Sequence, residues 1–263
     1  MKNLFSLDGK VIVVTGGAGY LGSAMVKGLV EFGACVMIAD MNIKSHEELV
    51  GSEGCGDRLC SILCDVSSTA SIREMLQETF EKWGRIDVLI NCATYGAGYG
   101  SAAGLWDMSD ADWQKGLDGA VGTAFRCTRE VMKYFDKNSG GNIINFGSMY
   151  GMVSPDPGIY GSSGQNNPVN YGAGKAAVLQ MTRYCAAHMA SRNIRVNSVT
   201  PGPFPNVGGS VPGEFLDKLS SKTILGRVGR PEEIVGAVVF LASDASSFMT
   251  GSNIVVDGGW TAW

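Results

Sequence analysis

Short apolar runs rich in β-branched residues alternate with helical patterns along the whole chain. The runs occupy residues 10–15, 35–40, 59–64, 86–91, 141–146, 194–199 and 253–257. Helical periodicity occupies residues 24–32, 68–83, 110–135, 169–191 and 231–241. Strands separated by helices pair in parallel through right-handed crossovers and are covered on both faces. The pattern predicts an α/β fold, a doubly wound parallel sheet of Rossmann type with helices on both faces.

The composition excludes several classes of protein. No repeat, low-complexity tract or linker interrupts the 263 residues, so we expect a single domain covering residues 1–263. The net charge of −4 offers no basic surface for nucleic acid or an anionic membrane. No apolar run is long enough to span a bilayer, and residues 1–8 lack the apolar core of a signal peptide. The cytosol is therefore the expected location.

The seven cysteines are expected to be reduced and mostly buried thiols. Their number is odd, no Cys-x-x-Cys pair occurs, and the chain has only two histidines. A metal site built from cysteine and histidine is therefore not expected.

A glycine-rich segment follows the first predicted strand and opens the first predicted helix. Glycines permit a tight turn and close approach of the backbone to a pyrophosphate, and the helix N-terminus supplies amide donors. Because the chain contains 37 glycines, a purely structural loop is the alternative interpretation. The context favours dinucleotide binding by Gly16, Gly17, Gly19, Tyr20, Leu21 and Gly22.

Asp40 ends the second predicted strand, where a carboxylate can accept hydrogen bonds from the adenosine ribose. The same carboxylate would repel a 2′-phosphate, and no Arg or Lys adjoins the loop or immediately follows Asp40. The sequence therefore favours NAD over NADP as cofactor.

Tyr171 and Lys175 lie four residues apart and share one face of a predicted helix. A free phenol ionises near pH ~10, and a nearby ammonium favours the phenolate. Tyr171 could then act as general acid and base at a carbinol or carbonyl carbon. Ser148, just after the fifth predicted strand, would hydrogen-bond the substrate oxygen. A Tyr-x-x-x-Lys pair by itself is more often a surface helix pair, and the combination with Ser148 and the glycine loop favours catalysis.

Together these motifs resemble the short-chain dehydrogenase/reductase family, in its compact single-domain branch, over nearly the whole chain. The resemblance implies that Asp65 and Val66 flank the adenine and that Lys175 also binds the nicotinamide ribose. It also implies a homodimer or homotetramer packed through helices 110–135 and 169–191. The remaining cofactor contacts that it implies are Asn91, Cys92 and Ala93 along the cofactor, and Pro201 and Gly202 over the nicotinamide.

Four features depart from the family pattern. Tyr20 stands where the compact branch usually has glycine, and Ala120 stands where a helix asparagine normally relays protons. Asp118 should not replace that asparagine, since it lies about 200° away around a helix. The spacing between Ser148 and Tyr171 is longer than usual, and residues 203–206 lack the usual threonine contact to the cofactor. Without the asparagine, the relay is expected to run through water and Lys175.

The extra residues before Tyr171 form a polar active-site loop, at about 150–170, that suits a polyhydroxylated substrate. A solvated surface excursion is the alternative. The chain here is also similar to short-chain members of bacterial surface-polysaccharide and flagellin-glycan sugar pathways. A Gly- and Pro-rich segment at about 203–225 is the expected mobile lid. The loop residues expected to face a sugar are Tyr150, Tyr160, Ser162, Ser163, Gln165, Asn166 and Asn167.

The leading hypothesis is an NAD-dependent oxidoreductase acting on a sugar, a sugar derivative or another polyol. A 3-oxoacyl or small-ketone reductase, and an epimerase-like enzyme that retains its cofactor, are alternatives within the same fold. A non-catalytic dinucleotide-binding regulatory or scaffold protein is an alternative of another class, because fold alone does not establish function.

Overall fold

Seven parallel strands form one sheet in the order β3-β2-β1-β4-β5-β6-β7. The computed structural model describes residues 3–43, 56–96, 104–161, 166–208 and 211–263. The strands are β1 (Val11–Thr15), β2 (Cys35–Asp40), β3 (Leu59–Leu63), β4 (Val88–Asn91), β5 (Gly141–Phe146), β6 (Ile194–Pro201) and β7 (Asn253–Val256). The predicted fold class and all seven predicted strands are confirmed.

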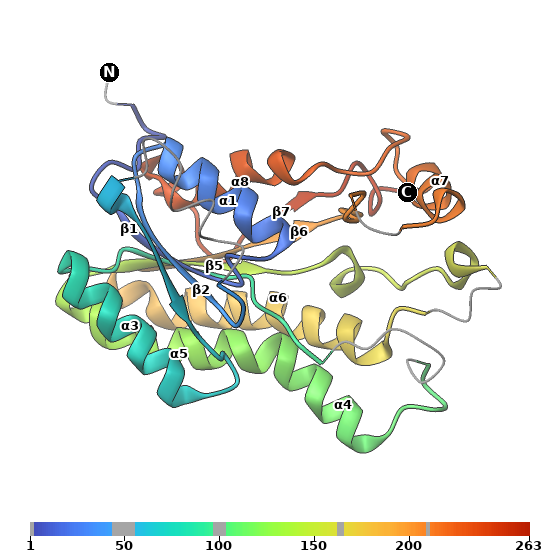
Figure 1. Cartoon of the computed structure of the whole chain (residues 1–263), viewed down its shortest axis with the longest axis horizontal. Coiled ribbons are helices and arrows are strands. Elements are labelled where there is room, and N and C mark those ends of the chain that lie inside the picture. Colours follow the sequence, from blue (N-terminus) through green and yellow to red (C-terminus); the bar gives the residue numbers. More distant parts are fainter. Residues whose placement is uncertain (1–2, 44–55, 97–103, 162–165, 209–210) are drawn as a thin grey trace.

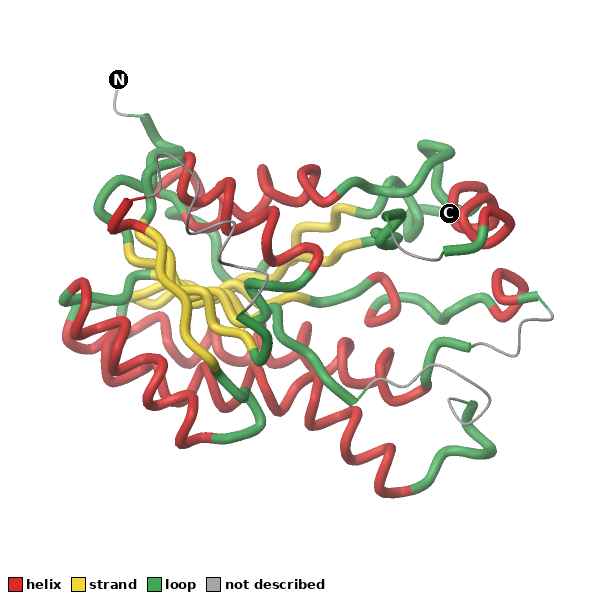
Figure 2. The backbone as a smooth tube through the Cα atoms, viewed as in Figure 1, coloured by secondary structure: helices red, strands yellow, loops and turns green. Residues whose placement is uncertain are grey.

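Helices cover both faces of this sheet (Figures 1 and 2). On one face lie α1 (Tyr20–Glu31) and α8 (Val235–Ala242), and on the other lie α3 (Thr69–Trp83), α5 (Thr123–Lys137) and α6 (Val169–Met189). Side chains alternate along each strand, so Ile12 packs in the core beneath α1 and α8, whereas Val13 packs in the core beneath α3, α5 and α6. Burial on both faces explains why the strands read as continuous apolar runs.

The strand order reverses direction beside β1. From β1 the chain first moves outward through β2 to β3, and it then returns to place β4 on the other side of β1. Loops leaving the carboxyl ends of β1 and β4 therefore diverge, and such a switch point is where doubly wound folds bind ligands.

The predicted helix 110–135 is interrupted in the structure. It consists of α4 (Asp110–Leu117), a π-helical turn η4 (Asp118–Gly122) and α5. At Gly119 in this turn, an added Cβ would overlap the carbonyl oxygen of Tyr95. The amide of Tyr95 in turn donates to the Gly119 carbonyl at 3.3 Å. The irregular turn thus accommodates the backbone that follows β4, a tertiary contact that helical periodicity does not report.

Other differences concern the loops. The expected lid contains a helix, α7 (Gly213–Ser221), and the active-site loop contains two 3-10 turns, η5 (Met149–Gly151) and η6 (Pro157–Tyr160). The helix predicted at 231–241 begins as a 3-10 turn, η8 (Pro231–Ile234), before α8.

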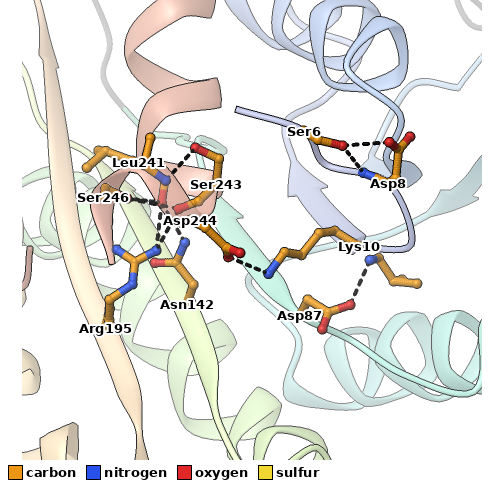
Figure 3. A network of polar contacts seen from close by, with 12 residues as sticks. Ser6, Asp8, Lys10, Asp87, Asn142, Arg195, Leu241, Ser243, Asp244 and Ser246 are labelled. Carbon is orange, nitrogen blue, oxygen red and sulfur yellow. Dashed lines mark hydrogen bonds and ion pairs between the residues drawn. The ribbon is translucent and has the colours of Figure 1, made fainter. Parts of the chain in front are cut away.

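A polar network joins the end of α8 to the amino-terminal ends of the strands (Figure 3). The carbonyl oxygen of Leu241 accepts hydrogen bonds from Asn142 Nδ2 at 2.7 Å and from the Arg195 guanidinium at 3.0 Å. Lys10 forms an ion pair with Asp244 at 3.3 Å. This network lies at the edge of the sheet opposite the glycine loop, because Lys10 and Asn142 lie at the starts of β1 and β5. It therefore leaves the carboxyl-terminal edge free for a site.

Within the described ranges, every cysteine is free and no group of His, Cys, Asp and Glu could hold a metal ion. Cys55 lies outside the described residues. None of the described helices combines the length and the apolar character needed to cross a bilayer.

Candidate active site

The glycine loop connects Thr15, at the end of β1, to Tyr20, at the start of α1. Gly16 has a φ of +70°, and a Cβ there would lie 2.9 Å from the backbone of Ala93. A Cβ at Gly22 would overlap the carbonyl oxygen of Gly16. The loop is therefore folded back on the first turn of α1 and pressed against the chain after β4, which requires glycine at both positions.

Thr15 holds the two segments together. Its hydroxyl donates to the Ile90 carbonyl at 3.3 Å and accepts from the amides of Cys92 at 3.2 Å and Ala93 at 3.3 Å. Thr15 belongs to the glycine-loop motif in the sequence, but the motif alone did not predict this role for it. Thr15 fixes Cys92 and Ala93 beside the loop, as their predicted place along a cofactor requires.

The start of α1 fits an anionic pyrophosphate. Its N-cap is Gly19, which provides no side-chain acceptor, whereas α3 and α4 are capped by Ser68 and Ser109. A Cβ at Gly19 would meet only the Gly16 carbonyl oxygen, at 3.2 Å, so the outer side of the loop is open. Uncapped amides and the positive end of the helix dipole are the groups that bind phosphate in dinucleotide folds.

Asp40 lies directly against this loop. One carboxylate oxygen accepts from the Ala18 amide at 3.0 Å and the other from the Asn42 amide at 3.1 Å. The chain after β3 lies beside it, since the amide of Cys64 donates to the Asp40 carbonyl at 2.9 Å. Asp40 is thus held at the edge of the switch point, where its carboxylate can face a ribose.

Asp65 and Val66 follow β3 along the same edge of the sheet. Hydrogen bonds from the Ser67 hydroxyl and amide lower the pKa of Asp65. The carbonyl of Val66 accepts from Arg126 Nε at 3.0 Å. Both residues lie outside the cavity lined by the catalytic candidates, at the end of the switch point expected to hold adenine.

The side chain of Asn91 lies inside the fold and not in the cavity. Its Nδ2 donates to Asn145 Oδ1 at 2.9 Å and to Thr128 Oγ1 at 3.3 Å, and Asn145 Nδ2 donates to Thr182 Oγ1 at 2.9 Å. Asn91 therefore ties β4 to β5 and α5, and Asn145 extends the connection to α6. Only the backbone of Asn91 is therefore available for contact with a cofactor, whereas Cys92 lines the cavity.

Ser148, Tyr171 and Lys175 meet in a cavity of about 930 Å³. Ser148 follows β5, and α6 presents Tyr171 and Lys175 one turn apart. The Ser148 and Tyr171 hydroxyls are hydrogen-bonded, and Lys175 Nζ lies 5.8 Å from the centroid of the Tyr171 ring. Pro201 and Gly202, at and just after the end of β6, line the same cavity.

Burial determines the ionisation of these groups. It raises the pKa of Tyr171, and the hydrogen bond with Ser148 opposes that rise. It lowers the pKa of Lys175 to about 8, and Lys175 Nζ donates to the Phe146 carbonyl at 2.8 Å. The expected lowering of the Tyr171 pKa by the Lys175 ammonium is not seen, because desolvation dominates and Lys175 is not among the groups that shift this pKa.

Ala120 is buried where α6 crosses the π-helical turn. A Cβ added at Gly174 would lie 2.6 Å from the Cβ of Ala120. Its carbonyl oxygen accepts from Thr123 Oγ1 at 2.9 Å. Asp118 points elsewhere, to Arg126 Nη1 at 2.7 Å and to the Tyr95 hydroxyl. Asp118 therefore does not replace a relay asparagine, as its angular position predicted.

The long loop and α7 complete the cavity wall. Of the loop residues expected to face substrate, Tyr150, Tyr160 and Asn167 line the cavity, and Asn166 does not. Ser162, Ser163 and Gln165 lie outside the described residues. The sequence pattern missed the apolar lining from the lid, namely Phe204, Phe215 and Leu219.

Among the described residues, an aromatic contact and an ion pair attach the lid segment to the loop. The rings of Tyr160 and Phe215 lie 5.7 Å apart, and Lys222 forms an ion pair with Asp156 at 2.5 Å. The amphipathic spacing of Phe215 and Leu219 was the available signal for this helix. Loop and lid therefore form one continuous wall opposite the catalytic candidates.

Several known proteins resemble this chain over nearly its whole length. The family described as enoyl-(acyl carrier protein) reductase matches residues 17–261. A 3-oxoacyl-[acyl-carrier-protein] reductase FabG of Thermotoga maritima is 36% identical over 255 residues, covering 96% of this chain and 98% of the relative. D-threitol dehydrogenase of Mycolicibacterium smegmatis is 33% identical over 261 residues, covering 98% of this chain and 95% of the relative.

Solved structures match over almost the full length. A short-chain type dehydrogenase/reductase from Mycobacterium marinum has a TM-score of 0.86 at 31% identity, covering 99% of this chain and 98% of that one. The chain belongs to the short-chain dehydrogenase/reductase family. A gluconate 5-dehydrogenase from Burkholderia cenocepacia J2315, in complex with NADP and tartrate, has a TM-score of 0.86 at 28% identity, covering 99% and 98%. A short chain dehydrogenase from Leptospira borgpetersenii with bound NAD+ also has a TM-score of 0.86 at 28% identity, covering 99% and 96%.

Membership in this family makes the protein an oxidoreductase that binds a nicotinamide dinucleotide and acts on a small molecule. The relatives include both acyl-carrier-protein and polyol enzymes, and the structures include both NAD and NADP complexes. The more specific resemblance to surface-glycan sugar pathways is not shown by these relatives.

Proposed function

We propose that this short-chain dehydrogenase/reductase transfers a hydride between NAD and a carbinol or carbonyl carbon of a sugar, sugar derivative or polyol. The observation that carries the proposal is the meeting of Ser148, Tyr171 and Lys175 in one cavity, next to the uncapped start of α1. Either group alone would be a weak signal. Together they provide a place for the dinucleotide and a proton-transfer group within reach of its reactive end.

In the oxidation direction, the carbinol carbon loses its hydrogen as hydride and its hydroxyl proton passes to the Tyr171 phenolate. The carbon becomes a carbonyl, and the reverse direction returns the proton from Tyr171 to the developing alkoxide. Ser148 holds the substrate oxygen through its hydroxyl. A bound oxidised nicotinamide would supply the acceptor for the hydride, and its positive charge would favour the phenolate.

Lys175 has two roles in this proposal. Its ammonium favours the ionised forms that develop nearby and hydrogen-bonds the nicotinamide ribose. Ala120 offers no side-chain carboxamide, so the proton leaves Tyr171 through Lys175 and water. The 2.8 Å bond from Lys175 to the Phe146 carbonyl keeps the amine within the cavity for this purpose.

NAD is proposed over NADP because of Asp40. Its carboxylate is held against the glycine loop by two backbone amides and would repel a 2′-phosphate. The family contains complexes of both cofactors, so this preference rests on Asp40 in this chain.

A 3-oxoacyl or small-ketone reductase is the second candidate. The apolar wall formed by Phe204, Phe215 and Leu219, and the similarity to FabG, support it. An acyl-carrier-protein substrate is highly acidic and would need a basic surface, which a chain of net charge −4 does not favour. We therefore keep the polyol as the leading substrate class.

Self-association as a dimer or tetramer through the faces of α5 and α6 is part of the proposal. Tyr184 on α6 stacks on His188 at 3.9 Å and is 60% exposed, so this face presents an aromatic surface. Light scattering on the purified protein measures the number of subunits, and a monomer would contradict this part.

The deciding test follows nicotinamide absorbance after the protein is mixed with NAD and a panel of free, phosphorylated and nucleotide-linked sugars and simple polyols. We expect NADH to form with one class. Tyr171→Phe should lower kcat by roughly 10²–10⁴-fold while NAD binding, followed by protein fluorescence, persists. Tyr134→Phe, on α5 and away from the cavity, is the matched control and should retain full activity. Unchanged turnover in Tyr171→Phe would overturn the role of Tyr171.

If the panel gives no NADH although NAD binds, the same preparation is assayed in reverse with NADH and 3-oxoacyl thioesters. Reduction there would establish the second candidate. Absence of hydride transfer in both directions would leave the non-catalytic dinucleotide-binding protein as the better description.

A further inference from the structure

Asn167 is a buried side chain without a hydrogen-bond partner in the wall of the substrate cavity. It is 6% exposed, it lines the cavity together with Ser148 and Tyr171, and its Oδ1 accepts no hydrogen bond. No hydrogen bond joins its Nδ2 to any residue that the structure describes either. Such groups are rare in folded proteins because a buried amide without partners is costly.

Three other buried asparagines also have an unpartnered Oδ1, but each is anchored through its Nδ2. Asn91 donates to Asn145, Asn142 donates to the Leu241 carbonyl, and Asn170 donates to the Asp112 carbonyl at 2.8 Å. These three are structural ties between elements. Asn167 differs from them because its whole carboxamide is left for a group from outside the chain.

The backbone holds Asn167 in place. The next residue is Pro168, the N-cap of α6, and its carbonyl accepts from the Tyr171 amide at 3.1 Å. A residue before proline is restricted to extended conformations. Asn167 is therefore positioned rigidly, about one turn before Tyr171, and the binding of a ligand does not have to order it.

We propose that the Asn167 carboxamide binds a second hydroxyl group of the substrate, beyond the hydroxyl that is oxidised. A carboxamide presents a donor and an acceptor side by side, and a hydroxyl is both donor and acceptor, so the two groups match. The site then selects diols and polyols, or the corresponding hydroxyketones, over alcohols with one hydroxyl. This inference rests on the proposed function and defines its substrate class more closely.

The chemistry of the other candidate substrates fits this position less well. A hydrocarbon or acyl chain placed against Asn167 would leave the carboxamide buried and unpaired in the complex. Sites built to hydrogen-bond a substrate hydroxyl discriminate strongly against analogues that lack it, for this reason.

The test compares substrates that differ by one hydroxyl. The unaltered enzyme and Asn167→Leu are assayed with NAD on butane-2,3-diol against butan-2-ol, and on cyclohexane-1,2-diol against cyclohexanol. In the unaltered enzyme, kcat/KM should favour each diol. In Asn167→Leu, we expect the ratio of diol to mono-alcohol to fall about tenfold, with the mono-alcohol rate retained.

Two further variants keep the test decisive. Asn167→Asp retains an acceptor and should keep part of the preference even if Asn167→Leu folds poorly. Asn166→Leu changes the neighbouring residue, which does not line the cavity, and should leave the ratio unchanged.

An equal ratio in the unaltered enzyme and Asn167→Leu, or a wild-type preference for the mono-alcohols, would overturn the inference and leave the proposed function intact. Absence of hydride transfer from all four alcohols would instead count against the proposed function, and the inference would fail with it.

Discussion

At the scale of single residues, burial and catalysis place opposing requirements on the protonation of Tyr171 and Lys175. Desolvation raises the pKa of Tyr171 and lowers that of Lys175 to about 8, so burial disfavours the charged form of both side chains. Catalysis requires the phenolate in one direction and the phenol in the other. The direction of the reaction should therefore show in the pH dependence.

The rate of alcohol oxidation should rise with pH across the alkaline range. The raised pKa of Tyr171 makes the phenolate scarce at neutral pH, whereas the phenol needed for ketone reduction is abundant there. Profiles of kcat/KM measured in both directions on one substrate pair check this. Oxidation that is already maximal at pH 6 would contradict the assignment of Tyr171 as the base.

Lys175→Met should stabilise the cofactor-free protein while it abolishes activity. A fall in the pKa of Lys175 from 10.5 to about 8 corresponds to about 3 kcal/mol of unfavourable charge burial. Loss of the hydrogen bond to the Phe146 carbonyl offsets about 1 kcal/mol, which leaves a net gain of about 2 kcal/mol at pH 7.

The pH dependence identifies the cause of this gain. Below pH 8 the amine is protonated in both the folded and unfolded states, so the folded protein carries the whole penalty. Between about 8 and 10.5 the folded state loses the proton first and the penalty declines. Denaturant unfolding should therefore show the largest difference between Lys175→Met and the unaltered protein at neutral pH and a smaller one at pH 10. A variant less stable at pH 7 would contradict the argument.

At the scale of single elements, the junction of β1 and α1 depends on close contact between the backbones of Gly22, Gly16 and Gly17. Gly22→Ala would place a Cβ into the Gly16 carbonyl and within 2.8 Å of the Gly17 backbone. The loop would have to move, so we expect at least a tenfold loss of NAD affinity and about 1–3 kcal/mol lower stability. Isothermal titration and chemical unfolding measure the two effects.

Gly236→Ala in α8 is the matched control. It is exposed, and no atom lies within 4 Å of an added Cβ. It should raise stability by about 0.8–1.0 kcal/mol and leave NAD binding unchanged, because alanine is the better helix former. Equal NAD affinity in Gly22→Ala and in the unaltered protein would show that this loop does not bind the cofactor.

The elements that could be predicted from sequence are those set by local periodicity. All seven strands and the glycine loop were found from apolar runs and their flanking residues. The π-helical turn was not predicted, because it depends on a tertiary contact with the backbone of Tyr95, which local periodicity does not report. Helix α7 was missed because the Gly- and Pro-rich composition around Phe215 reads as a loop. The direction of the Asn91 side chain could not be predicted either, because it is fixed by hydrogen-bond partners on β5 and α5.

At the scale of the whole molecule, the amino-terminal and carboxyl-terminal edges of the sheet differ in their polar contacts. The amino-terminal edge is closed by the network around Leu241, in which Asn142 and Arg195 satisfy one carbonyl (Figure 3). At the carboxyl-terminal edge, the start of α1 has no side-chain cap, and the Oδ1 of Asn167 accepts no hydrogen bond. These groups lie at the carboxyl-terminal edge, where doubly wound sheets are expected to bind ligands.

Dinucleotide binding should accordingly stabilise the whole fold, since the folded chain brings together segments that are far apart in sequence. In the proposed cofactor site, the loop after β1, Asp40 at the end of β2 and Gly202 after β6 come together only in the folded state. A ligand that binds this state alone at 100 times its Kd adds about 2.7 kcal/mol to the free energy of unfolding. NAD should therefore raise Tm by several degrees, and NADP at the same concentration by much less, because Asp40 repels the 2′-phosphate.

Asp40→Ser removes that repulsion and should reduce the difference between the Tm shifts with NAD and with NADP. Asp57→Ser, which replaces an acid near the start of β3, should leave this difference unchanged. Equal shifts with NAD and NADP in the unaltered protein would show that Asp40 does not select the cofactor, and a larger shift with NADP would reverse the proposed preference.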